Sequence, residues 1–412
     1  MRSFKRPILI TALALLGLQS CKNEASEEVS EDRAAEVIAE VRQEYVPDKR
    51  VALFDIESEP QGKSYVLKGD SNLPEAVAAL REKLQAADVD YIDSIQLLPS
   101  DELKGKTRAL VRTSVANIRS NQGHSSELAT QATLGTPLKV LKHDGDWYLV
   151  QTPDNYIAWV DHGGITPLTE QEFASWKAAE KVIFLRPYGQ AYEKAATNSG
   201  IVSDVVAGDI FVLKGSKNGF FEVEYPDGKI GYLEKDKAQP YKEWIASRSL
   251  SEEELVSTSK ELMGLPYLWG GTSPKGVDCS GFTKTIYFMN GMVIPRDASQ
   301  QVHTGKVVDS TKNFENLQPG DLLFFGTPAT DSSKERVVHV GMWIGDNKMI
   351  HSSGNVHISS MDPNSEDFDE FNYNRYLRTK RLVGEEDPNL LLLSRNDLFM
   401  AQKPASDSLS KK

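Results

Sequence analysis

The sequence lacks an excess of positive charge and has no strongly biased composition. Its 47 Lys and Arg residues are outnumbered by 59 Asp and Glu residues, which gives a formal net charge of −12. A negative protein repels phosphate backbones, so binding to nucleic acid is disfavoured. Hydrophobic residues make up 40% and charged residues 26% of the chain, which argues against a disordered, collagen-like or polytopic membrane protein. We therefore expect globular domains, about two to four of them at ~150 residues each.

A long hydrophobic run is also missing at the N-terminus. Residues 7–18 are apolar and follow three basic residues. They are too few for the ~20 residues that span a bilayer, but they suit the core of a secretory signal peptide. The stretch ends in Leu18-Gln19-Ser20-Cys21, which resembles the lipobox of bacterial lipoproteins. This resemblance implies a signal peptide over residues 1–20, lipidation of Cys21 and attachment to a bacterial membrane, on the periplasmic face or the cell surface. The alternative is a cleaved secretory peptide with an incidental cysteine.

Cysteine is scarce, because only Cys21 and Cys279 are present. If Cys21 carries lipid, Cys279 has no partner for an intramolecular disulfide, and a free thiol remains in an oxidising compartment. Burial as a small hydrophobic residue would explain a single cysteine. The residues around Cys279 favour a chemical role instead.

The first part of the mature chain predicts a tether and a small α/β unit. Residues 21–44 are rich in acidic side chains and are expected to form a polar tether. The α/β unit is expected over 45–110, with a strand-like run at 50–56, helical spacing of apolar residues at 74–87 and a second strand-like run at 91–98. It contains no His, no Cys and no Gly-rich loop, so we expect a structural role.

An internal repeat follows this unit. Residues 147–160 align with residues 220–233 at a constant offset (147 + 73 = 220). In each copy an aromatic-rich strand leads to Pro-Asp and then Asn or Gly, a tight-turn signal, before a second strand. The pattern predicts two small β-barrels, which resemble bacterial SH3-like domains over 113–164 and 181–238. Such modules commonly bind or position cell-wall peptides, although aromatic residues at strand spacing are more often packed in the core.

The last expected domain spans residues 251–383. Ser251 followed by three glutamates is typical of a helix N-terminus. A Gly-Glu-Glu-Asp-Pro sequence at 384–388 interrupts the pattern. No function is predicted for the C-terminal tail, residues 384–412.

Cys279 carries the strongest chemical signal in this domain. Glycines and turn residues precede it and a potentially helical run follows, which predicts that Cys279 lies at a helix N-terminus. The thiolate is the nucleophilic form, and a free cysteine of pKa ~8.5 is only slightly ionised at pH 7. Unpaired N–H groups and a neighbouring imidazolium are expected to lower this pKa.

His339 is the expected general base, and His351 is expected to orient it. Residues 337–345 and 348–353 predict the two strands of a hairpin. In an antiparallel hairpin, the residue numbers of directly opposed residues add up to a constant. His339 and His351 point to the same face only if this sum is even. A type I turn with Asn347 in the left-handed conformation and a bulge would provide this.

Two interpretations of these three residues remain open. They could act as nucleophile, base and orienter of a cysteine hydrolase. Alternatively, Cys279, His339 and His351 could hold zinc with one open position. No further cluster of ligand-type residues accompanies them, so we expect neither a metal nor another cofactor.

Residues 278–282, residues 339–341 and His351 together resemble the signature of the NlpC/P60 family of cell-wall cysteine peptidases. The resemblance implies a papain-like domain over 251–383, with Cys279, His339 and His351 as the catalytic triad. The whole chain is then expected to be an α+β multidomain protein, in which the α/β unit and two SH3-like barrels precede the peptidase domain.

The substrate is also implied by resemblance. The domain order is similar to that of γ-D-glutamyl-L-diamino-acid endopeptidases of the dipeptidyl-peptidase VI type, in which the first SH3-like module closes one end of the cleft. This implies hydrolysis of the γ-D-glutamyl-diamino-acid bond in murein stem peptides that carry a free N-terminal L-Ala. Murein peptides and the membrane are therefore the expected partners.

Seven further residues are expected in the cleft: Tyr267, Trp269, Asp278, Ser280, Asp297, Tyr156 and Glu127. Tyr267 would help to stabilise the oxyanion, and Trp269 would wall the cleft. Asp278 and Ser280 match positions that contact the D-glutamyl part, although Ser280 could instead cap the helix.

The remaining three cleft residues are expected to bind the substrate ammonium. A partly buried ammonium needs carboxylate or aromatic partners. Asp297, Glu127 and Tyr156 could supply them.

Two other functions remain open from the sequence alone. The third domain could grip wall peptides without catalysis. It could also act as a general endopeptidase or amidase on intact sacculi.

Overall fold

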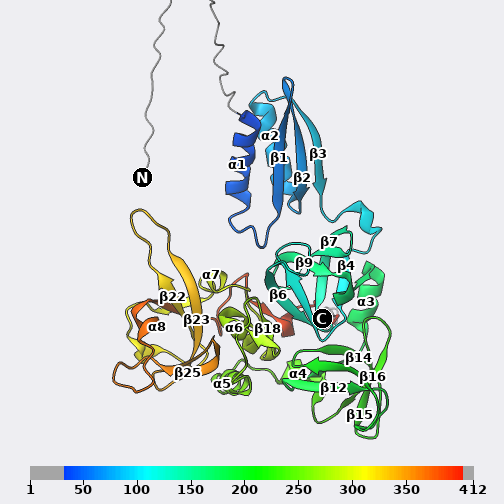
Figure 1. Ribbon diagram of the computed structural model, residues 1–412, viewed down its shortest axis with the longest axis vertical. Helices are drawn as coiled ribbons and strands as arrows, with labels where there is room; N and C mark the ends of the chain where they lie inside the picture. Colours follow the sequence, from blue (N-terminus) through cyan, green and yellow to red (C-terminus); the bar gives the residue numbers. More distant parts are fainter. Residues whose placement is uncertain (1–31, 402–412) are drawn as a thin grey trace, which may run out of the picture.

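The computed structural model describes residues 32–401 (Figure 1). The expected signal peptide, the lipidation site Cys21 and the start of the expected tether lie outside this range, as does the end of the C-terminal tail. Within residues 32–401, no helix is long and apolar enough to cross a membrane.

The N-terminal unit is a three-stranded sheet with two helices packed on it (Figure 1). β1 and β2 are antiparallel, whereas β2 and β3 are parallel and joined by α2. The elements are α1 (Arg33–Tyr45), β1 (Phe54–Gln61), β2 (Ser64–Ser71), α2 (Pro74–Ala86) and β3 (Tyr91–Leu97). Both helices bury their apolar faces against the sheet, where Ile38 of α1 and Leu80 of α2 share a core with Leu67 of β2.

The helix α1 shows that the prediction of a polar tether over residues 21–44 is wrong from Arg33 onward. Asp32 caps it by accepting the Ala35 N–H at 2.9 Å. Ala34, Ile38 and Val41 are buried at a spacing of one helical face. Residues 33–45 therefore belong to the packed unit, because three apolar side chains suffice to dock an otherwise acidic helix.

Other boundaries of the unit differ less from the prediction. The helix at 74–87 and the strand at 91–98 are confirmed within one residue by α2 and β3. The first strand begins at Phe54, so residues 50–53 are a loop and not the start of a strand. The unit ends before residue 108, since the next strand pairs in a different sheet.

The repeat region forms two seven-stranded antiparallel sheets with the same strand order. The first runs β10-β4-β7-β8-β9-β5-β6, and the second runs β17-β11-β14-β15-β16-β12-β13, which matches it strand for strand. The first sheet contains β4 (Arg108–Val111), β5 (Val115–Arg119), β6 (Leu128–Thr133), β7 (Pro137–Asp144), β8 (Trp147–Gln151), β9 (Ile157–Asp161) and β10 (Ile165–Leu168). The second contains β11 (Lys181–Phe184), β12 (Tyr188–Tyr192), β13 (Ile201–Val206), β14 (Ile210–Lys217), β15 (Phe220–Glu224), β16 (Ile230–Glu234) and β17 (Ala238–Pro240).

The repeated hairpin agrees with the sequence pattern in detail. Trp147 pairs with Asp161 in the first copy, and Phe220 pairs with Glu234 in the second. Asn155 and Gly228 stand at the same turn position (155 + 73 = 228), and both have positive φ, 65° and 85°. The turn residue tolerates the left-handed region in each copy. Both sheets extend a few residues beyond the expected limits, because β4, β10 and β17 lie outside them.

Four short helices lie between these elements. η1 (Asp101–Leu103) precedes the first sheet and η2 (His162–Gly164) lies between its strands β9 and β10, whereas α3 (Glu170–Ala178) joins the two sheets and α4 (Tyr241–Ser247) follows the second. The first sheet lies between the N-terminal unit and the second sheet (Figure 1). Ser114 of the first sheet donates to Asp204 of the second at 3.0 Å.

The last domain is built on a six-stranded antiparallel sheet, β21-β26-β22-β23-β24-β25. The helix α6 packs on one face through Phe282 and Ile286, against Phe324, Val340 and Met342. The helices are α5 (Glu252–Glu261), α6 (Cys279–Met289), α7 (Ala298–Gln301), η3 (Phe314–Asn316) and α8 (Glu370–Asn374). The strands are β18 (Thr272–Ser273), β19 (Gly276–Val277), β20 (Met292–Val293), β21 (Lys306–Asp309), β22 (Leu322–Thr327), β23 (Arg336–Gly345), β24 (Lys348–Ser353), β25 (Asn355–Ser360) and β26 (Tyr376–Arg381).

The sequence predicted the start of the last domain but not the structure that follows its expected end. Ser251 caps α5 as predicted, by accepting the Glu254 N–H at 3.3 Å. Part of the C-terminal tail is structured, since β27 (Leu391–Leu392) pairs with β20 and is followed by η4 (Leu393–Arg395). Phe399 is buried against Tyr241 and Phe288. The described part of the tail therefore links the last domain to α4, the helix that follows the second sheet.

Candidate active site

Cys279 is the first residue of α6, as the sequence predicted. Asp278 caps the helix by accepting the Gly281 N–H at 2.7 Å. The cysteine is buried, and the backbone N–H groups of Ser280 and Val340 lie near enough to its sulfur to favour a lower pKa. Val340 follows His339 in β23, so the strand that carries the expected base passes directly beside the sulfur.

The hairpin of β23 and β24 has the even register that the sequence argument required. Met342 pairs with Ile350 (342 + 350 = 692), and a bulge lies between Trp343 and Gly345. Asn347 has the predicted positive φ of 54°, but Asp346 also has one, of 52°. The turn therefore has two left-handed central residues, as in type I′, and the type I expectation is wrong.

This register brings the two histidines together. His339 Nε2 lies 2.8 Å from His351 Nδ1, with the rings 77° apart in an edge-on arrangement. Gly341 makes room for this contact, because a Cβ there would lie 3.0 Å from Met349 Sδ and 3.3 Å from the His351 Cβ. The two imidazoles therefore form the adjacent pair that the sequence predicted.

His351 has further partners that the sequence did not reveal. Its Nε2 lies 3.1 Å from Ser359 Oγ, and Ser359 donates to Asp369 Oδ2 at 3.4 Å. The His357 ring lies 4.4 Å away on the paired strand β25. No local motif marks Asp369, which comes from the N-terminus of α8. A chain of polar groups therefore holds the second histidine.

The same contacts disfavour the zinc alternative. Both ring nitrogens of His351 face polar partners, His339 and Ser359, which leaves neither free to coordinate a metal. Between Asp32 and Ala401, the structure contains no group of three or more His, Cys, Asp or Glu residues that could hold a metal ion.

The electrostatics of the triad differ from the sequence prediction. Burial raises the pKa of the Cys279 thiol to about 11, and the Asp278 carboxylate adds to this shift. Burial lowers the pKa of His339 well below its usual value, and burial together with the neighbouring His357 lowers that of His351 to about 4. The predicted lowering of the cysteine pKa is therefore wrong for the unliganded protein. Desolvation outweighs the two N–H donors, and both imidazoles are neutral.

A cleft of about 480 Å³ opens at Cys279 and contains every other expected cleft residue. Its walls come from both the first sheet and the peptidase domain. The seven expected residues that line it are Tyr267, Trp269, Asp278, Ser280, Asp297, Tyr156 and Glu127. Sequence reasoning did not single out Arg50, Arg296 and Arg336, which also line the cleft.

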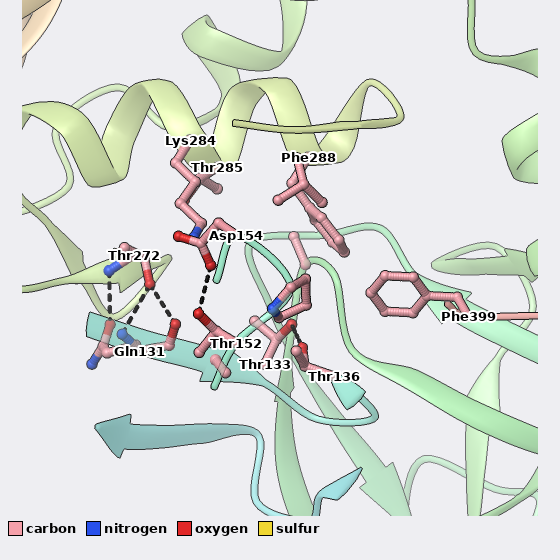
Figure 2. Close-up of a pocket in the computed structure, with 14 residues that line it drawn as sticks. Gln131, Thr133, Thr136, Thr152, Asp154, Thr272, Lys284, Thr285, Phe288 and Phe399 are labelled. Carbon is pink, nitrogen blue, oxygen red and sulfur yellow. Dashed lines mark hydrogen bonds and ion pairs between the residues drawn. The ribbon is translucent and has the colours of Figure 1, made fainter. Parts of the chain in front are cut away.

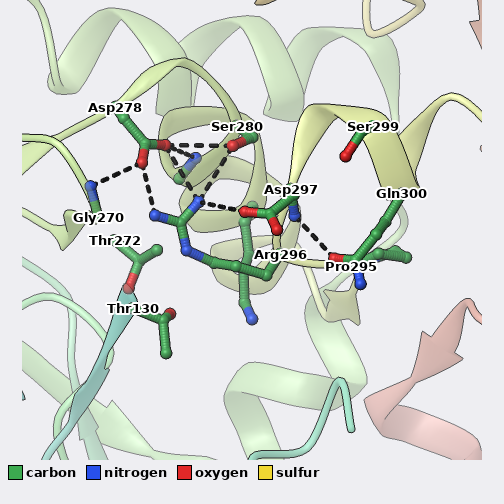
Figure 3. A network of polar contacts seen from close by, with 12 residues as sticks. Thr130, Gly270, Thr272, Asp278, Ser280, Pro295, Arg296, Asp297, Ser299 and Gln300 are labelled. Atoms are coloured by element: carbon green, nitrogen blue, oxygen red, sulfur yellow. Dashed lines mark hydrogen bonds and ion pairs between the residues drawn. The ribbon is translucent and has the colours of Figure 1, made fainter. Parts of the chain in front are cut away.

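Arg296 organises the floor of the cleft (Figure 3). It is 1% exposed, and its Nη1 and Nη2 reach Asp278 at 3.1 and 2.5 Å. Nη1 also donates to Ser280 Oγ at 3.0 Å, and the Gly270 N–H donates to Asp278 at 2.9 Å. Asp278 is thus the helix cap, and the alternative that Ser280 caps the helix is wrong. The Pro295-Arg296-Asp297 sequence was the available signal for Arg296.

The first sheet contributes its part of the cleft through a close contact. Trp269 Nε1 donates to Glu127 Oε1 at 2.6 Å, across the two domains. Gly270 (φ +80°) touches the first sheet so closely that a Cβ would lie 2.0 Å from the Leu128 carbonyl oxygen. Only glycine fits such a contact. Glu127 is therefore fixed beside Trp269 at one side of the cleft.

Two polar contacts strengthen this interface (Figure 2). Thr272 of β18 and Gln131 of β6 exchange hydrogen bonds, including Thr272 Oγ1 to the Gln131 carbonyl at 2.8 Å. Lys284 of α6 points toward Asp154, in the turn of the first sheet, and forms a buried ion pair with it. The turn that carries Tyr156 is therefore tied to the helix that carries Cys279.

Tyr156 and Tyr267 both keep their hydroxyl protons at neutral pH. Burial and the nearby Asp297 raise the pKa of Tyr156. Burial, followed by Cys279 and Asp278, raises the pKa of Tyr267 to about 12. Each tyrosine can therefore donate a hydrogen bond into the cleft.

The buried Cys279 at the start of α6, the His339–His351 pair on the neighbouring hairpin and the cleft between the last domain and the first sheet form the arrangement expected of a cysteine peptidase. The comparisons with known proteins agree. The NlpC/P60 family model matches residues 264–371, and the bacterial SH3 domain model matches residues 114–166. That the second sheet is also an SH3-like domain stays a prediction, supported by its strand order.

Similar proteins cover a large part of the chain. A γ-D-glutamyl-L-lysine dipeptidyl-peptidase of Bacillus cereus is 32% identical over 247 residues, 56% of this chain and 68% of that protein. A dipeptidyl-peptidase 6 of Lysinibacillus sphaericus is 27% identical over 266 residues, 62% of this chain and 92% of that protein. The crystal structure of an NlpC/P60 family protein from Bacillus cereus matches with a TM-score of 0.55 and 29% identity, over 67% of this chain and 99% of that one. The chain belongs to the NlpC/P60 family of cysteine peptidases.

Proposed function

We propose that this peptidase hydrolyses the γ-D-glutamyl-diamino-acid bond of murein stem peptides that carry a free N-terminal L-Ala. One observation carries the proposal: a single cleft unites Cys279 with Glu127 and Tyr156 of the first sheet and with Asp297. Two carboxylates and a tyrosine suit a primary ammonium. The names of the relatives, γ-D-glutamyl-L-lysine dipeptidyl-peptidase and dipeptidyl-peptidase 6, support this substrate class.

The polar chain behind His339 sets the tautomer needed for general base catalysis. A hydroxyl has one hydrogen, so Ser359, which donates to Asp369, accepts from His351 Nε2–H. His351 Nδ1 then accepts from His339 Nε2–H. This leaves His339 Nδ1 unprotonated and able to take the thiol proton.

The reaction then proceeds through an acyl-enzyme. His339 removes the proton of Cys279, and the sulfur attacks the γ-carbonyl carbon of the D-glutamyl residue, forming the C–S bond. The Tyr267 hydroxyl and the Cys279 backbone N–H stabilise the oxyanion. The amine of the diamino acid leaves with the proton from His339, and water, deprotonated by the same histidine, hydrolyses the thioester. Thiol and imidazole both start neutral, so the ion pair forms only along this reaction path.

We also propose that the protein is exported and anchored to a bacterial membrane through Cys21. The lipobox-like sequence supports this location. Incorporation of labelled palmitate, abolished by Cys21→Ala, is the expected result. A Cys21→Ala protein that still carries label would contradict the proposal.

The catalytic proposal is tested with the tripeptide L-Ala-γ-D-Glu-L-Lys and its N-acetylated form. The purified protein should release lysine from the free tripeptide, and Cys279→Ala should reduce the rate by at least about 10⁴-fold, as expected for loss of a nucleophile. Cys21→Ala, which removes the other cysteine, is the matched control and should keep full activity. An active Cys279→Ala variant would exclude the mechanism.

The acetylated peptide tests the ammonium-binding residues separately. We expect a kcat/KM at least about a hundredfold lower than for the free peptide, since acetylation removes the ammonium that Glu127, Tyr156 and Asp297 are proposed to bind. Equal rates on both peptides would instead favour a general endopeptidase that acts on intact stems.

A further inference from the structure

The N-terminal unit reaches into the catalytic cleft through one side chain, Arg50. This unit lies outside both family matches, which cover residues 114–166 and 264–371. Arg50 Nη1 donates to Asp297 Oδ2 at 2.6 Å and to Ser299 Oγ at 2.9 Å. Its cation therefore occupies one oxygen of a carboxylate that we assign to substrate binding.

Arg50 is held firmly in this position. Its Nε and Nη2 each donate to Asp48 at 2.8 Å, and Asp48 accepts from Gln300 Nε2 at 2.8 Å. The Arg50 carbonyl accepts the N–H of Ile157, the residue after Tyr156, at 2.7 Å. The guanidinium is thus fixed by the N-terminal unit, the first sheet and the peptidase domain together.

This bridge separates the catalytic cleft from a second one. The second cleft has a volume of about 900 Å³ and lies between the N-terminal unit, the first sheet and the peptidase domain. Arg50 and Ser299 line both clefts, whereas Asp297 lines only the catalytic cleft and Asp48 lines only the larger one. Figure 3 shows Asp297 and Ser299 side by side at the start of α7.

We propose that Arg50 is a specificity-determining residue that forms the end wall of the catalytic cleft. It limits the substrate, on the N-terminal side of D-glutamate, to a single small residue. The inference deepens the proposed function and rests on it. A peptide extended by one residue would have to displace the guanidinium, which would break its ion pairs with Asp48 and Asp297, whose side chains are 25% and 27% exposed. Asp48 would lose its cationic partner, and Asp297 would keep only the longer contact with Arg296, at 3.9 Å.

The contacts argue for a fixed wall and against a removable inhibitor that imitates the substrate ammonium. An inhibitory side chain must leave when substrate binds. Arg50 is tied at its backbone and by two bonds to a carboxylate of its own unit, so it stays in place while substrate binds beside it.

The test compares L-Ala-γ-D-Glu-L-Lys with Gly-L-Ala-γ-D-Glu-L-Lys, which keeps a free ammonium but is one residue longer. The ratio of kcat/KM for the long peptide to that for the short one should rise at least about tenfold in Arg50→Ala, the equivalent of ~1.4 kcal/mol. Lys49→Ala is the matched control, because Lys49 lines only the larger cleft, and it should leave the ratio unchanged. Arg50→Lys retains the charge without the planar fork and should give an intermediate ratio.

Binding of both peptides to the full chain carrying Cys279→Ala, measured by calorimetry, gives a second readout that needs no turnover. The affinity ratio should shift in the same direction when Arg50→Ala is added. A similar rise in activity on both peptides in Arg50→Ala would identify Arg50 as an inhibitor, and a similar fall would show a purely structural role. Either result, or an unchanged ratio, would contradict the proposal that Arg50 forms the end wall of the cleft.

Failure of the proposed function can be distinguished from failure of the Arg50 proposal. A wild-type protein that cleaves neither peptide refutes that function, while the binding ratio still decides the role of Arg50. Absence of both cleavage and binding would overturn the two proposals together.

Discussion

At the scale of the residue, the surroundings of Cys279 shift the pKa of its thiol in opposite directions. Two backbone N–H donors favour its thiolate, whereas burial and the Asp278 carboxylate favour the thiol and raise its pKa to about 11. Burial likewise keeps His339 and His351 neutral. These shifts favour a neutral thiol and neutral imidazoles over a thiolate–imidazolium pair in the unliganded site.

This balance predicts a steep pH dependence for alkylation. In a Cys21→Ala protein, whose only thiol is Cys279, reaction with iodoacetamide should be slow at pH 7 and should accelerate about tenfold per pH unit toward pH 10, because only the thiolate reacts. The sign follows from a raised pKa, which keeps the proton on sulfur until the pH approaches about 11. Mass spectrometry of the modified protein measures the rate. A rate already maximal at pH 7 would show that a thiolate exists in the resting enzyme.

At the scale of the element, the hairpin of β23 and β24 positions His339, the proposed base. Its bulge and two-residue turn place His339 and His351 on one face, and Gly341 leaves the space that His351 needs. The even register could be argued from the sequence because turn chemistry and side-chain alternation are local. The contacts of Ser359 and Asp369 with His351 could not be predicted from the sequence, since these residues come near His351 only when β25 and α8 fold around it.

Gly341→Ala should therefore act through the position of His351. A Cβ at this site would lie 3.0 Å from Met349 Sδ and 3.3 Å from the His351 Cβ, so the neighbours would shift by a few tenths of an ångström. This is less than the ~1 Å that costs about a hundredfold, and we expect kcat to fall about tenfold with little change in KM. Gly215→Ala is the control, because a Cβ at Gly215 would have nothing within 4 Å. Steady-state kinetics of both variants on the free tripeptide make the comparison. A Gly341→Ala enzyme with wild-type kcat would contradict the prediction that Gly341 leaves space for His351.

At the scale of the whole molecule, the cleft exists only because the first sheet docks on the peptidase domain. The buried pair of Lys284 and Asp154 lies in this interface, with the Asp154 side chain only 2% exposed. Removal of one partner leaves a buried charge alone, which is strongly destabilising. The contacts of Glu127 with Trp269 and of Gln131 with Thr272 depend on the same docking.

We predict that Lys284→Ala destabilises the protein by about 3 kcal/mol. The exposed pair of Lys177 and Asp397, whose aspartate side chain is 62% exposed, is the control, and Lys177→Ala should cost less than about 1 kcal/mol. Chemical denaturation followed by tryptophan fluorescence measures both. Equal effects of the two substitutions would mean that the interface contributes little to stability.

The sequence by itself determined the parts of this protein that depend on neighbours in the chain. Cys279 at a helix start, the histidine hairpin and the repeated turn around Asn155 and Gly228 all follow from local rules of capping, alternation and positive φ. For the same reason the repeat at 147–160 and 220–233 was found without knowledge of the sheets.

Only the tertiary structure decided the features that depend on burial or on distant segments. The helix at 33–45 is stabilised by the sheet that it covers. The raised pKa of Cys279 reflects desolvation, which no sequence pattern reports. The bridge from Arg50 to Asp297 joins residues 247 positions apart, and such a pairing becomes visible only when three domains have closed around one cleft.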